Sequence, residues 1–144
     1  MNVQDVMTRD VEYIPSDTTL AEAALKMRDS DTGFLPIGDS DQSKLQGVIT
    51  DRDIVVRAIA AGKDPNKATV KEFKTDKVLY CYQSDSVESA AENMREQQVY
   101  RLVVLDNKDD KRLCGIVSLG DVVRHDNENL GGKTARGISE GKTH

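Results

Sequence analysis

The chain contains an internal repeat, and this constrains its fold more than any other feature. Residues 47–55 read GVITDRDIV and residues 115–123 read GIVSLGDVV, so a glycine, two β-branched residues, a hydroxyl residue and an aspartate recur in the same order. The likeness extends upstream, where apolar residues return 67 positions later: Leu20, Ala23, Ala24 and Met27, then Val87, Ala90, Ala91 and Met94. Duplicated units of this kind bury their apolar surface against one another.

Both apolar sets have the i, i+3, i+4, i+7 spacing of a helix that turns one face to a core. We expect capping residues before these helices, at Asp17 and Thr18 and at Ser84 and Asp85. Runs of β-branched and aromatic residues predict short strands around each helix, at 11–14, 34–37 and 45–50 and again at 78–81, 101–105 and 113–118.

Two further helical elements complete each copy of the repeat. A short helical turn is expected at the front of each, over 3–7 and 70–73. A closing helix is expected after each GVITDRD-like motif, and in the first copy its apolar face consists of Ile54, Val55, Ala58 and Ile59. In the second copy this helix becomes polar soon after Val123.

The element order β-α-β-β-α predicts an α/β (α+β) fold. A βαβ step implies a parallel strand pair with a right-handed crossover. One such unit leaves an apolar sheet face uncovered, so the two copies are expected to lay these faces together with pseudo-two-fold symmetry. The predicted division is 1–62 for the first repeat, 63–69 for a linker, 70–125 for the second repeat and 126–144 for a polar tail that is expected to be mobile.

Composition excludes several classes of protein. With 38% hydrophobic residues the chain suits a globular fold, and a net charge of -5 without a basic run argues against a nucleic-acid partner. No apolar run reaches the roughly 20 residues of a membrane helix, and the first ten residues lack the regions of a signal peptide. These features predict a cytoplasmic protein that is not bound to a membrane.

The residues that usually hold metals are sparse. The two cysteines, Cys81 and Cys114, lie in strand-like stretches without Cys-x-x-Cys spacing, so we expect buried, reduced thiols. Only two histidines occur, and one of them, His144, is the last residue of the polar tail. No metal site is therefore predicted.

The repeated motif permits two interpretations. Thr50 and Ser118 stand where a strand gives way to a helix, a position whose free amide groups favour an anion such as phosphate. Asp53 and Asp121 present two acceptor oxygens each, which suits the two hydroxyls of a ribose diol. The initial glycine lets another backbone or a flat ring approach closely. However, Thr-x-x-Asp and Ser-x-x-Asp before an apolar helix are also typical of a structural capping box.

The order and spacing of several motifs resemble those of tandem cystathionine-β-synthase (CBS) domains, also called a Bateman module. The resemblance covers Val3 to about Arg124, and residues 27–66 are similar to small stand-alone bacterial CBS-pair proteins, including the hypoxic-response type. It rests on VQDVMT at 3–8, the Leu-x-x-Ala-Ala-x-x-Met helix, GFLPI at 33–37 and GVITDRD at 47–53. Val103 departs from the pattern, because a proline often lies at this place in the family.

The resemblance implies a regulatory module that binds an adenosine derivative, such as AMP, ADP, ATP or S-adenosylmethionine, in a cleft between the repeats. By similarity, the hydroxyls of Thr50 and Ser118 contact phosphate, and the carboxylates of Asp53 and Asp121 contact ribose. Other residues expected at the ligand are Ile14 and Tyr82, which border the base, and Arg101, which reaches the phosphate held by Thr50 and Asp53, with help from Arg52. The site at Ser118 and Asp121 is expected to lack such a cation.

The resemblance also implies homodimers that pair through helical faces, and an effector protein whose identity the sequence does not reveal. The leading hypothesis is a non-enzymatic sensor that requires no cofactor and changes its contacts when a nucleotide binds. The alternative is a structural or protein-interaction module in which the motifs are caps and no nucleotide binds. An enzyme is disfavoured, because neither a catalytic constellation nor a phosphate-binding loop of the G-x-x-x-x-G-K-[ST] type is found in the sequence.

Overall fold

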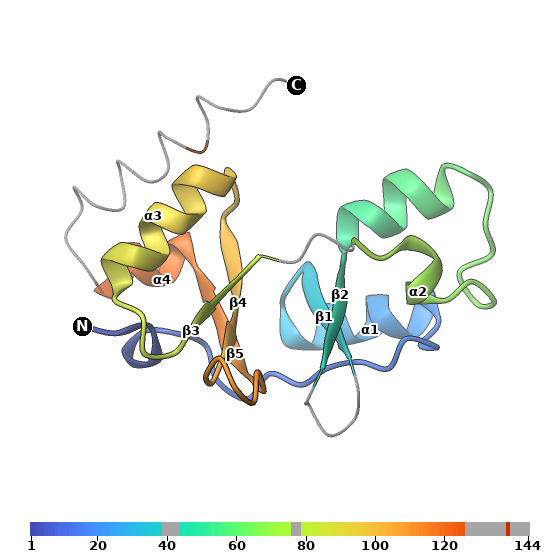
Figure 1. Ribbon diagram of the computed structural model, residues 1–144. Helices are drawn as coiled ribbons and strands as arrows, with labels where there is room; N and C mark the ends of the chain where they lie inside the picture. The colour runs from blue at the N-terminus through green and yellow to red at the C-terminus, as the bar shows by residue number, and fades with distance from the viewer. Residues whose placement is uncertain (39–43, 76–78, 126–137, 139–144) are drawn as a thin grey trace. The chain divides into compact units, whose positions relative to one another are not determined.

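Figure 1 shows the computed structural model of the chain, which describes residues 1–38, 44–75, 79–125 and 138. The chain divides into two compact units. One consists of residues 12–78 and is called here the Asp53 unit, after its motif aspartate. The other combines residues 1–11 with 79–144 and is called the Asp121 unit. Each contains strands and helices together, so the predicted α+β class is confirmed.

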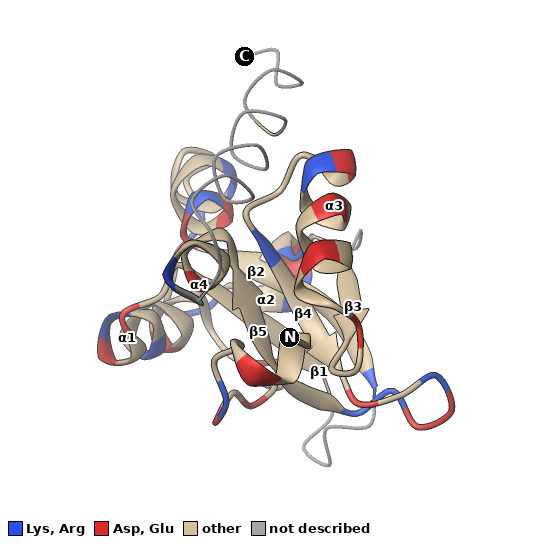
Figure 2. Cartoon of the chain, turned by 90° about the vertical axis from the view of Figure 1, so that its left-hand side faces the viewer, with Lys and Arg blue, Asp and Glu red and all other residues tan. Residues whose placement is uncertain are grey.

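The Asp121 unit is built on a three-stranded sheet with the order β3-β4-β5. β3 (Tyr80–Tyr82) runs parallel to β4 (Arg101–Leu105), and β5 (Leu113–Ser118) returns antiparallel to β4. The helices α3 (Val87–Gln97) and α4 (Leu119–His125) lie on one face of this sheet (Figure 1). The outward side of α3 carries charged residues of both signs, as expected for a solvated surface (Figure 2).

The core of the Asp121 unit lies between that sheet face and its helices. Ala90 and Met94 of α3 pack with Leu102 and Val104 of β4, and Val122 of α4 joins the same cluster. Because these residues follow the predicted helical and strand periods, the apolar pattern of the sequence is sufficient to explain the arrangement.

The Asp53 unit repeats this plan with one strand fewer. α1 (Leu20–Ser30) is followed by the antiparallel pair β1 (Phe34–Gly38) and β2 (Leu45–Thr50), and then by η2 (Asp53–Ile59), a π-helix, and α2 (Val70–Phe73). Its core includes Leu20 and Ala23 of α1, Ile37 and Ile49 of the strands, and Val70 of α2.

The prediction of a strand at 11–14 is wrong. Within the described part of the chain, this segment forms a single parallel bridge, between Ile14 and Ile37. In the Asp121 unit the amide of Val103 donates to Leu79 O at 3.0 Å and extends the pairing of β3. Pro36 occupies the equivalent place in β1, and proline has no amide hydrogen to donate. The corresponding hydrogen bond in the Asp53 unit therefore cannot form, and the strand is reduced to one bridge.

Each compact unit takes its leading segment from the other sequence repeat. Residues 2–8, which include η1 (Val3–Asp5), belong to the Asp121 unit, where Asn2 bridges Ser86 and Thr8 bridges Ile116. Residues 69–75 belong to the Asp53 unit and form the matching bridges, from Thr69 to Thr19 and from Thr75 to Val48. The two leading segments are thus exchanged between the repeats, while the repeat boundaries 1–62 and 70–125 stay a prediction.

The motif glycines lie under these leading segments. A Cβ atom added to Gly115 would lie 2.3 Å from Thr8 O, and one added to Gly47 would lie 3.0 Å from Thr75 O. The predicted close approach of another backbone to these glycines is therefore confirmed, and the approaching chain is the exchanged leading segment.

The helix ends differ in detail from the sequence prediction. The N-caps are Thr19 for α1 and Ser86 for α3, each of which accepts a hydrogen bond from a backbone amide of the first turn. The predicted caps at 17–18 and 84–85 were placed one or two residues too early, because several adjacent polar residues have equal capping preference. Both helices end in the left-handed conformation, at Asp31 and Gln98.

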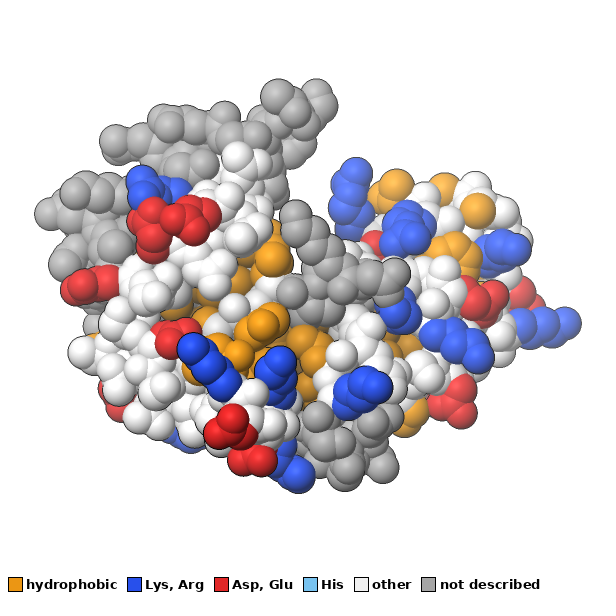
Figure 3. Space-filling view, in the orientation of Figure 1, with side chains coloured by type: hydrophobic (Ala, Val, Ile, Leu, Met, Phe, Trp, Pro, Cys, Tyr) orange, Lys and Arg blue, Asp and Glu red, His pale blue; other side chains and the backbone are white. Residues whose placement is uncertain are grey.

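The closing helix of the first repeat does not have the predicted apolar face. η2 buries Ile54 and Ala58, but Val55, Val56 and Ile59 are 59%, 48% and 45% exposed. Since a π-helix turns less per residue than an α-helix, the α-helical period assigned two of these residues to the wrong side. The exposed apolar side chains gather over η2, at the upper right of Figure 3.

The predicted polar tail at 126–144 lies outside the described residues, with the exception of Ile138. That side chain is fully buried and belongs to the core cluster that also contains Val3, Val6 and Val122. The described part of the chain contains no helix of the length and apolar character needed to cross a membrane.

Both cysteines are free, and burial makes their thiols less acidic. Cys81 lies buried in β3, and burial, followed by the charge of Asp85, raises its thiol pKa to about 12. Cys114 is only partly buried; burial and then Asp106 raise the pKa of its thiol as well. Reduced thiols were predicted at both positions, and full burial is found only at Cys81.

We expect Gly115→Ala to lower the free energy of unfolding by about 1–3 kcal/mol, because the new methyl group would collide with Thr8 O. Gly120→Ala is the matched control, since its Cβ would lie 3.3 Å from the flexible end of Arg124 and alanine favours a helix. Urea titration of both variants measures the difference. Equal stability of the two variants would contradict the close packing of residues 2–8 over β5.

A thiol reagent at pH 8 should modify Cys114 well before Cys81 in the native protein. The thiolate is the reactive form, and a pKa of about 12 leaves Cys81 almost fully protonated at this pH. Stopped reactions analysed by peptide mass spectrometry would give the order of modification, with Cys114→Ser as the control that removes the faster phase. Rapid labelling of Cys81 without unfolding would show that β3 is open to solvent.

Candidate functional site

The hydroxyl and the aspartate of each motif bind one another's backbone. In the Asp53 unit, the amide of Thr50 donates to Asp53 Oδ2 at 3.0 Å, and the amide of Asp53 donates to Thr50 Oγ1 at 3.0 Å. In the Asp121 unit, the amide of Ser118 donates to Asp121 Oδ2 at 2.9 Å, and the amide of Asp121 donates to Ser118 Oγ at 3.1 Å. This reciprocal pattern is that of a capping box.

The second oxygen of each carboxylate serves a different partner. Asp53 Oδ1 accepts a hydrogen bond from Arg57 Nη1 at 3.3 Å, and Asp121 Oδ1 accepts one from Arg124 Nη2. The aspartates are nearly inaccessible, with exposures of 6% and 3%, whereas the arginine side chains are 50% and 65% exposed. Each buried carboxylate is therefore covered by a cation that is itself half in solvent.

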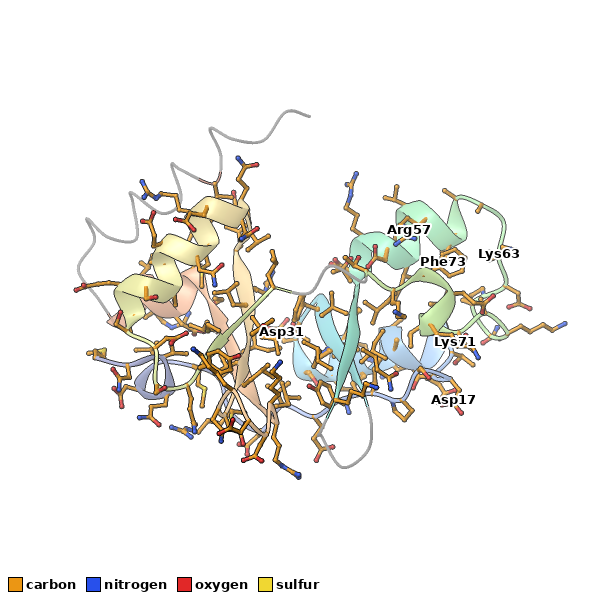
Figure 4. All side chains as sticks on the ribbon, viewed as in Figure 1. Asp17, Asp31, Arg57, Lys63, Lys71 and Phe73 are labelled. Carbon is orange, nitrogen blue, oxygen red and sulfur yellow. The ribbon has the colours of Figure 1, made fainter. Side chains whose placement is uncertain are left out.

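Arg57 also reaches the leading segment of its unit. Its Nη1 donates to Phe73 O at 2.9 Å in addition to Asp53, and Figure 4 shows the labelled side chains of Arg57 and Phe73 next to each other. Thr75 Oγ1 donates to Asp53 Oδ2 at 3.3 Å. Asp53 is thus bonded to the motif, to η2 and to the segment 69–75.

Arg101 lies in the same unit as Ser118. In the register of β4 and β5, Arg101 stands directly opposite Ser118, while Phe34 stands opposite Thr50 in β1 and β2. Residues that face one another across antiparallel strands point to the same side of the sheet. The expectation that the Ser118 site lacks a cation is not tested and stays a prediction, although the strand register places Arg101 directly across from Ser118. The predicted reach of Arg101 to Thr50 and Asp53 stays a prediction.

The remaining predicted site residues divide between the two units. Ile14 is buried in the Asp53 unit, where it forms the bridge to Ile37. Arg52 is exposed, and its amide is bonded to Asp51 Oδ1 at 2.8 Å. Tyr82 is half-buried in the Asp121 unit, with its ring 5.8 Å from that of Tyr80 in an edge-to-face arrangement.

The structure accordingly forms two sets of predicted site residues. Ile14, Thr50, Arg52 and Asp53 belong to one unit, and Tyr82, Arg101, Ser118 and Asp121 belong to the other. Sequence reasoning missed Arg57, Arg124 and Thr75. The two arginines had a detectable signal, because residues three or four positions after an aspartate in a helix lie on the same side of it. Thr75 had none, since it comes from a distant part of the chain.

No cluster of three or more metal-binding side chains (His, Cys, Asp or Glu) occurs within the part of the chain that the structure describes. The side chains that contact the motif carboxylates are arginines and a threonine, and these residue types are not the usual ligands of zinc. The chemistry offered by each set is hydrogen bonding to hydroxyl groups and to anions.

Comparisons with known proteins agree with this architecture. The family model for the CBS domain matches twice, over residues 3–59 and 70–128. Hypoxic response protein 1 of Mycobacterium tuberculosis is 42% identical over 123 residues, which are 85% of this chain and 82% of that protein. The crystal structure of Hypoxic Response Protein I with two coordinated zinc ions superposes with a TM-score of 0.76 at 38% identity, covering 87% of this chain and 98% of that one.

Two other solved structures are similar. The CBS domain pair of protein MJ0100, in complex with 5′-methylthioadenosine and S-adenosyl-L-methionine, has a TM-score of 0.73 and 30% identity, covering 92% of this chain and 98% of that chain. The hexameric CBS-CP12 protein from bloom-forming cyanobacteria has a TM-score of 0.74 and 26% identity, covering 88% of this chain and 68% of that one. With two domain matches and a 42% identical relative, the chain belongs to the CBS domain family and carries the domain as a tandem pair.

Proposed function

We propose that the chain is a regulatory module that binds an adenosine-containing ligand through the motif residues of its two repeats. One observation carries this proposal: each motif aspartate uses only Oδ2 to cap its own helix and leaves Oδ1 to an exposed arginine. A structural cap needs only the first of these contacts. Because each of these arginines is half in solvent and would stay hydrated after leaving Oδ1, a ribose hydroxyl can take its place there.

The motif hydroxyls are suited to phosphate. Thr50 Oγ1 and Ser118 Oγ each accept one hydrogen bond from a backbone amide, and each retains its own proton to donate. Arg101 makes no side-chain hydrogen bond or ion pair with any residue that the structure describes, and its place opposite Ser118 makes it a suitable partner for a phosphate there. Ile14, Arg52 and Tyr82 are proposed to contact the base and the phosphate of the ligand in their own units.

The ligand class is supported by the neighbour MJ0100, whose CBS pair binds 5′-methylthioadenosine and S-adenosyl-L-methionine. The proposed class comprises AMP, ADP, ATP and S-adenosylmethionine, and its location in a cleft between the repeats stays a prediction. We propose that no cofactor is needed and that the chain is not an enzyme, so bound ATP should be recovered unchanged. An unidentified effector protein would distinguish the ligand-bound form from the ligand-free form.

The alternative function is a structural or protein-interaction module without a nucleotide. The completeness of both capping boxes favours it, because the hydroxyl and the carboxylate already satisfy one another's backbone amides. Removal of a cap typically costs about 0.5–2 kcal/mol of stability in either case. The two functions therefore differ in the effect of a nucleotide on stability and not in the effect of the mutation alone.

We further propose that the chain forms homodimers. Val55, Val56 and Ile59 form an exposed apolar face on η2, and the CBS-CP12 neighbour assembles as a hexamer. A second copy of the chain is the proposed occupant of this face, because the pairing of identical helices buries the same apolar residues from both copies.

Asp53→Ala should weaken binding of AMP by about tenfold to a hundredfold, the loss of about 1.5–3 kcal/mol expected for hydrogen bonds to a charged group. Asp53→Asn is the sharper variant, since its amide oxygen can still accept from the amide of Thr50. Calorimetry measures the affinities, and a thermal-shift panel tests whether AMP, ADP, ATP or S-adenosylmethionine raises the melting temperature. A wild-type protein that none of these ligands stabilises would support the alternative function.

Arg101→Met should weaken the binding of AMP by roughly tenfold or more and leave the binding of adenosine almost unchanged, because the guanidinium is proposed to contact phosphate only. Lys108→Met is the matched control, because it removes an exposed cation from the same unit at a position outside the proposed site, and both affinities should stay unchanged. Competition binding gives the ratio of wild-type to variant affinity for each of the two ligands. Equal weakening of AMP and adenosine would remove the phosphate role of Arg101.

Val56→Asp should shift the protein from dimer to monomer, because a buried unpaired carboxylate opposes association at this face. Gln97→Glu at the exposed end of α3 is the control, since it lowers the net charge by the same one unit without touching the apolar face. Light scattering coupled to size-exclusion chromatography reports the mass of each variant. A dimer that survives Val56→Asp would place the interface elsewhere.

A further inference from the structure

The segment 69–75 is held to the Asp53 site by side-chain contacts. Thr75 Oγ1 donates to Asp53 Oδ2 at 3.3 Å, and Arg57 Nη1 joins Phe73 O at 2.9 Å to Asp53 Oδ1 at 3.3 Å. The backbones of Thr75 and Val48 also exchange two hydrogen bonds, of 2.8 and 3.1 Å. One carboxylate thus fastens the end of a segment that comes from outside its own motif.

The equivalent carboxylate in the other unit has no such role among the described residues. Thr8 and Ile116 exchange two backbone hydrogen bonds, of 2.8 and 3.1 Å, as Thr75 and Val48 do. Yet the partners of the Asp121 side chain in the described ranges are confined to the amide of Ser118 and to Arg124, both from its own motif and helix. The leading segment 2–8 is therefore held without help from Asp121.

The hydrogen-bonding capacity of Asp53 limits how many of its present partners can stay when a ribose diol binds. A carboxylate has about four acceptor positions, and Thr50, Thr75 and Arg57 fill three of them. A ribose diol donates two hydrogen bonds, so at least one of these partners must leave. The contacts from Thr75 and Arg57 are both 3.3 Å, longer than the 3.0 Å contact from the amide of Thr50, so they are the ones that yield.

We propose that the segment 69–75 is the output element of the Asp53 site. A diol bound to Asp53 displaces Thr75 Oγ1 and Arg57 Nη1, and the end of the segment is loosened. Because the chain passes from the Asp53 unit into the Asp121 unit shortly after this segment, the part of the chain that joins the units responds to the ligand. A ligand on Asp121 has no corresponding effect on the segment 2–8. This inference rests on the proposed function, since it requires a diol at Asp53.

The first test needs no ligand. Hydrogen exchange, followed by NMR and corrected for intrinsic rates, is measured for the amides at positions 75 and 48. Thr75→Val or Arg57→Gln should speed both amides by about three- to tenfold, as expected when one supporting hydrogen bond is lost. Thr8→Val is the matched control and should leave the amides at positions 8 and 116 unchanged. Unchanged rates at 75 and 48 in both test variants would overturn the proposal.

The second test adds AMP or 2′,3′-dideoxyadenosine monophosphate, which lacks the diol, each at concentrations that calorimetry shows to give equal occupancy. AMP should speed exchange at 75 and 48 by a similar factor, and the dideoxy compound should not. If AMP binds but the rates stay constant or fall, this inference fails and the proposed function stands. If no nucleotide binds, both fail.

Discussion

The backbone amides at the ends of β2 and β5 need acceptors, and Asp53 and Asp121 provide them. An amide left without a partner near the core would cost about 1–3 kcal/mol, so these contacts are required for stability whatever else the residues do. The hydroxyls of Thr50 and Ser118 in turn accept hydrogen bonds from backbone amides in the first turn of the following helix. Strand, turn and helix are joined by two reciprocal hydrogen bonds, and this explains why the motif keeps its spacing in both copies.

A functional role is compatible with this structural one because the two oxygens of each carboxylate have different partners. One oxygen accepts a hydrogen bond from the backbone, and the other is paired with an arginine whose side chain is half in solvent. The same residue can therefore stabilise the helix start and recognise a ligand. The capping and binding interpretations describe different atoms of one side chain, and the sequence alone could not separate them.

Local patterns allowed much of the fold to be predicted. The ranges of β2, β4 and β5 follow from runs of β-branched residues bounded by polar connectors, and α2 from its short helical pattern. The helical turn of η2 was misjudged, because its π geometry is not encoded in the apolar spacing around Val55 and Ile59. The motif residues were identified, but their partners Thr75 and Phe73 lie in a segment whose packing depends on the tertiary structure. The position of Arg101 beside Ser118 required the strand register.

The exchange of leading segments has a consequence for the history of such a chain. In a protein made of one repeat with this packing, the leading segment would have no second repeat to pack on, and the piece that covers the motif glycine would be missing. Only a second molecule could provide that piece. Gene duplication followed by fusion would then have joined a swapped pair of separate polypeptides into one chain, and the two halves would have inherited a mutual dependence that later divergence had to preserve.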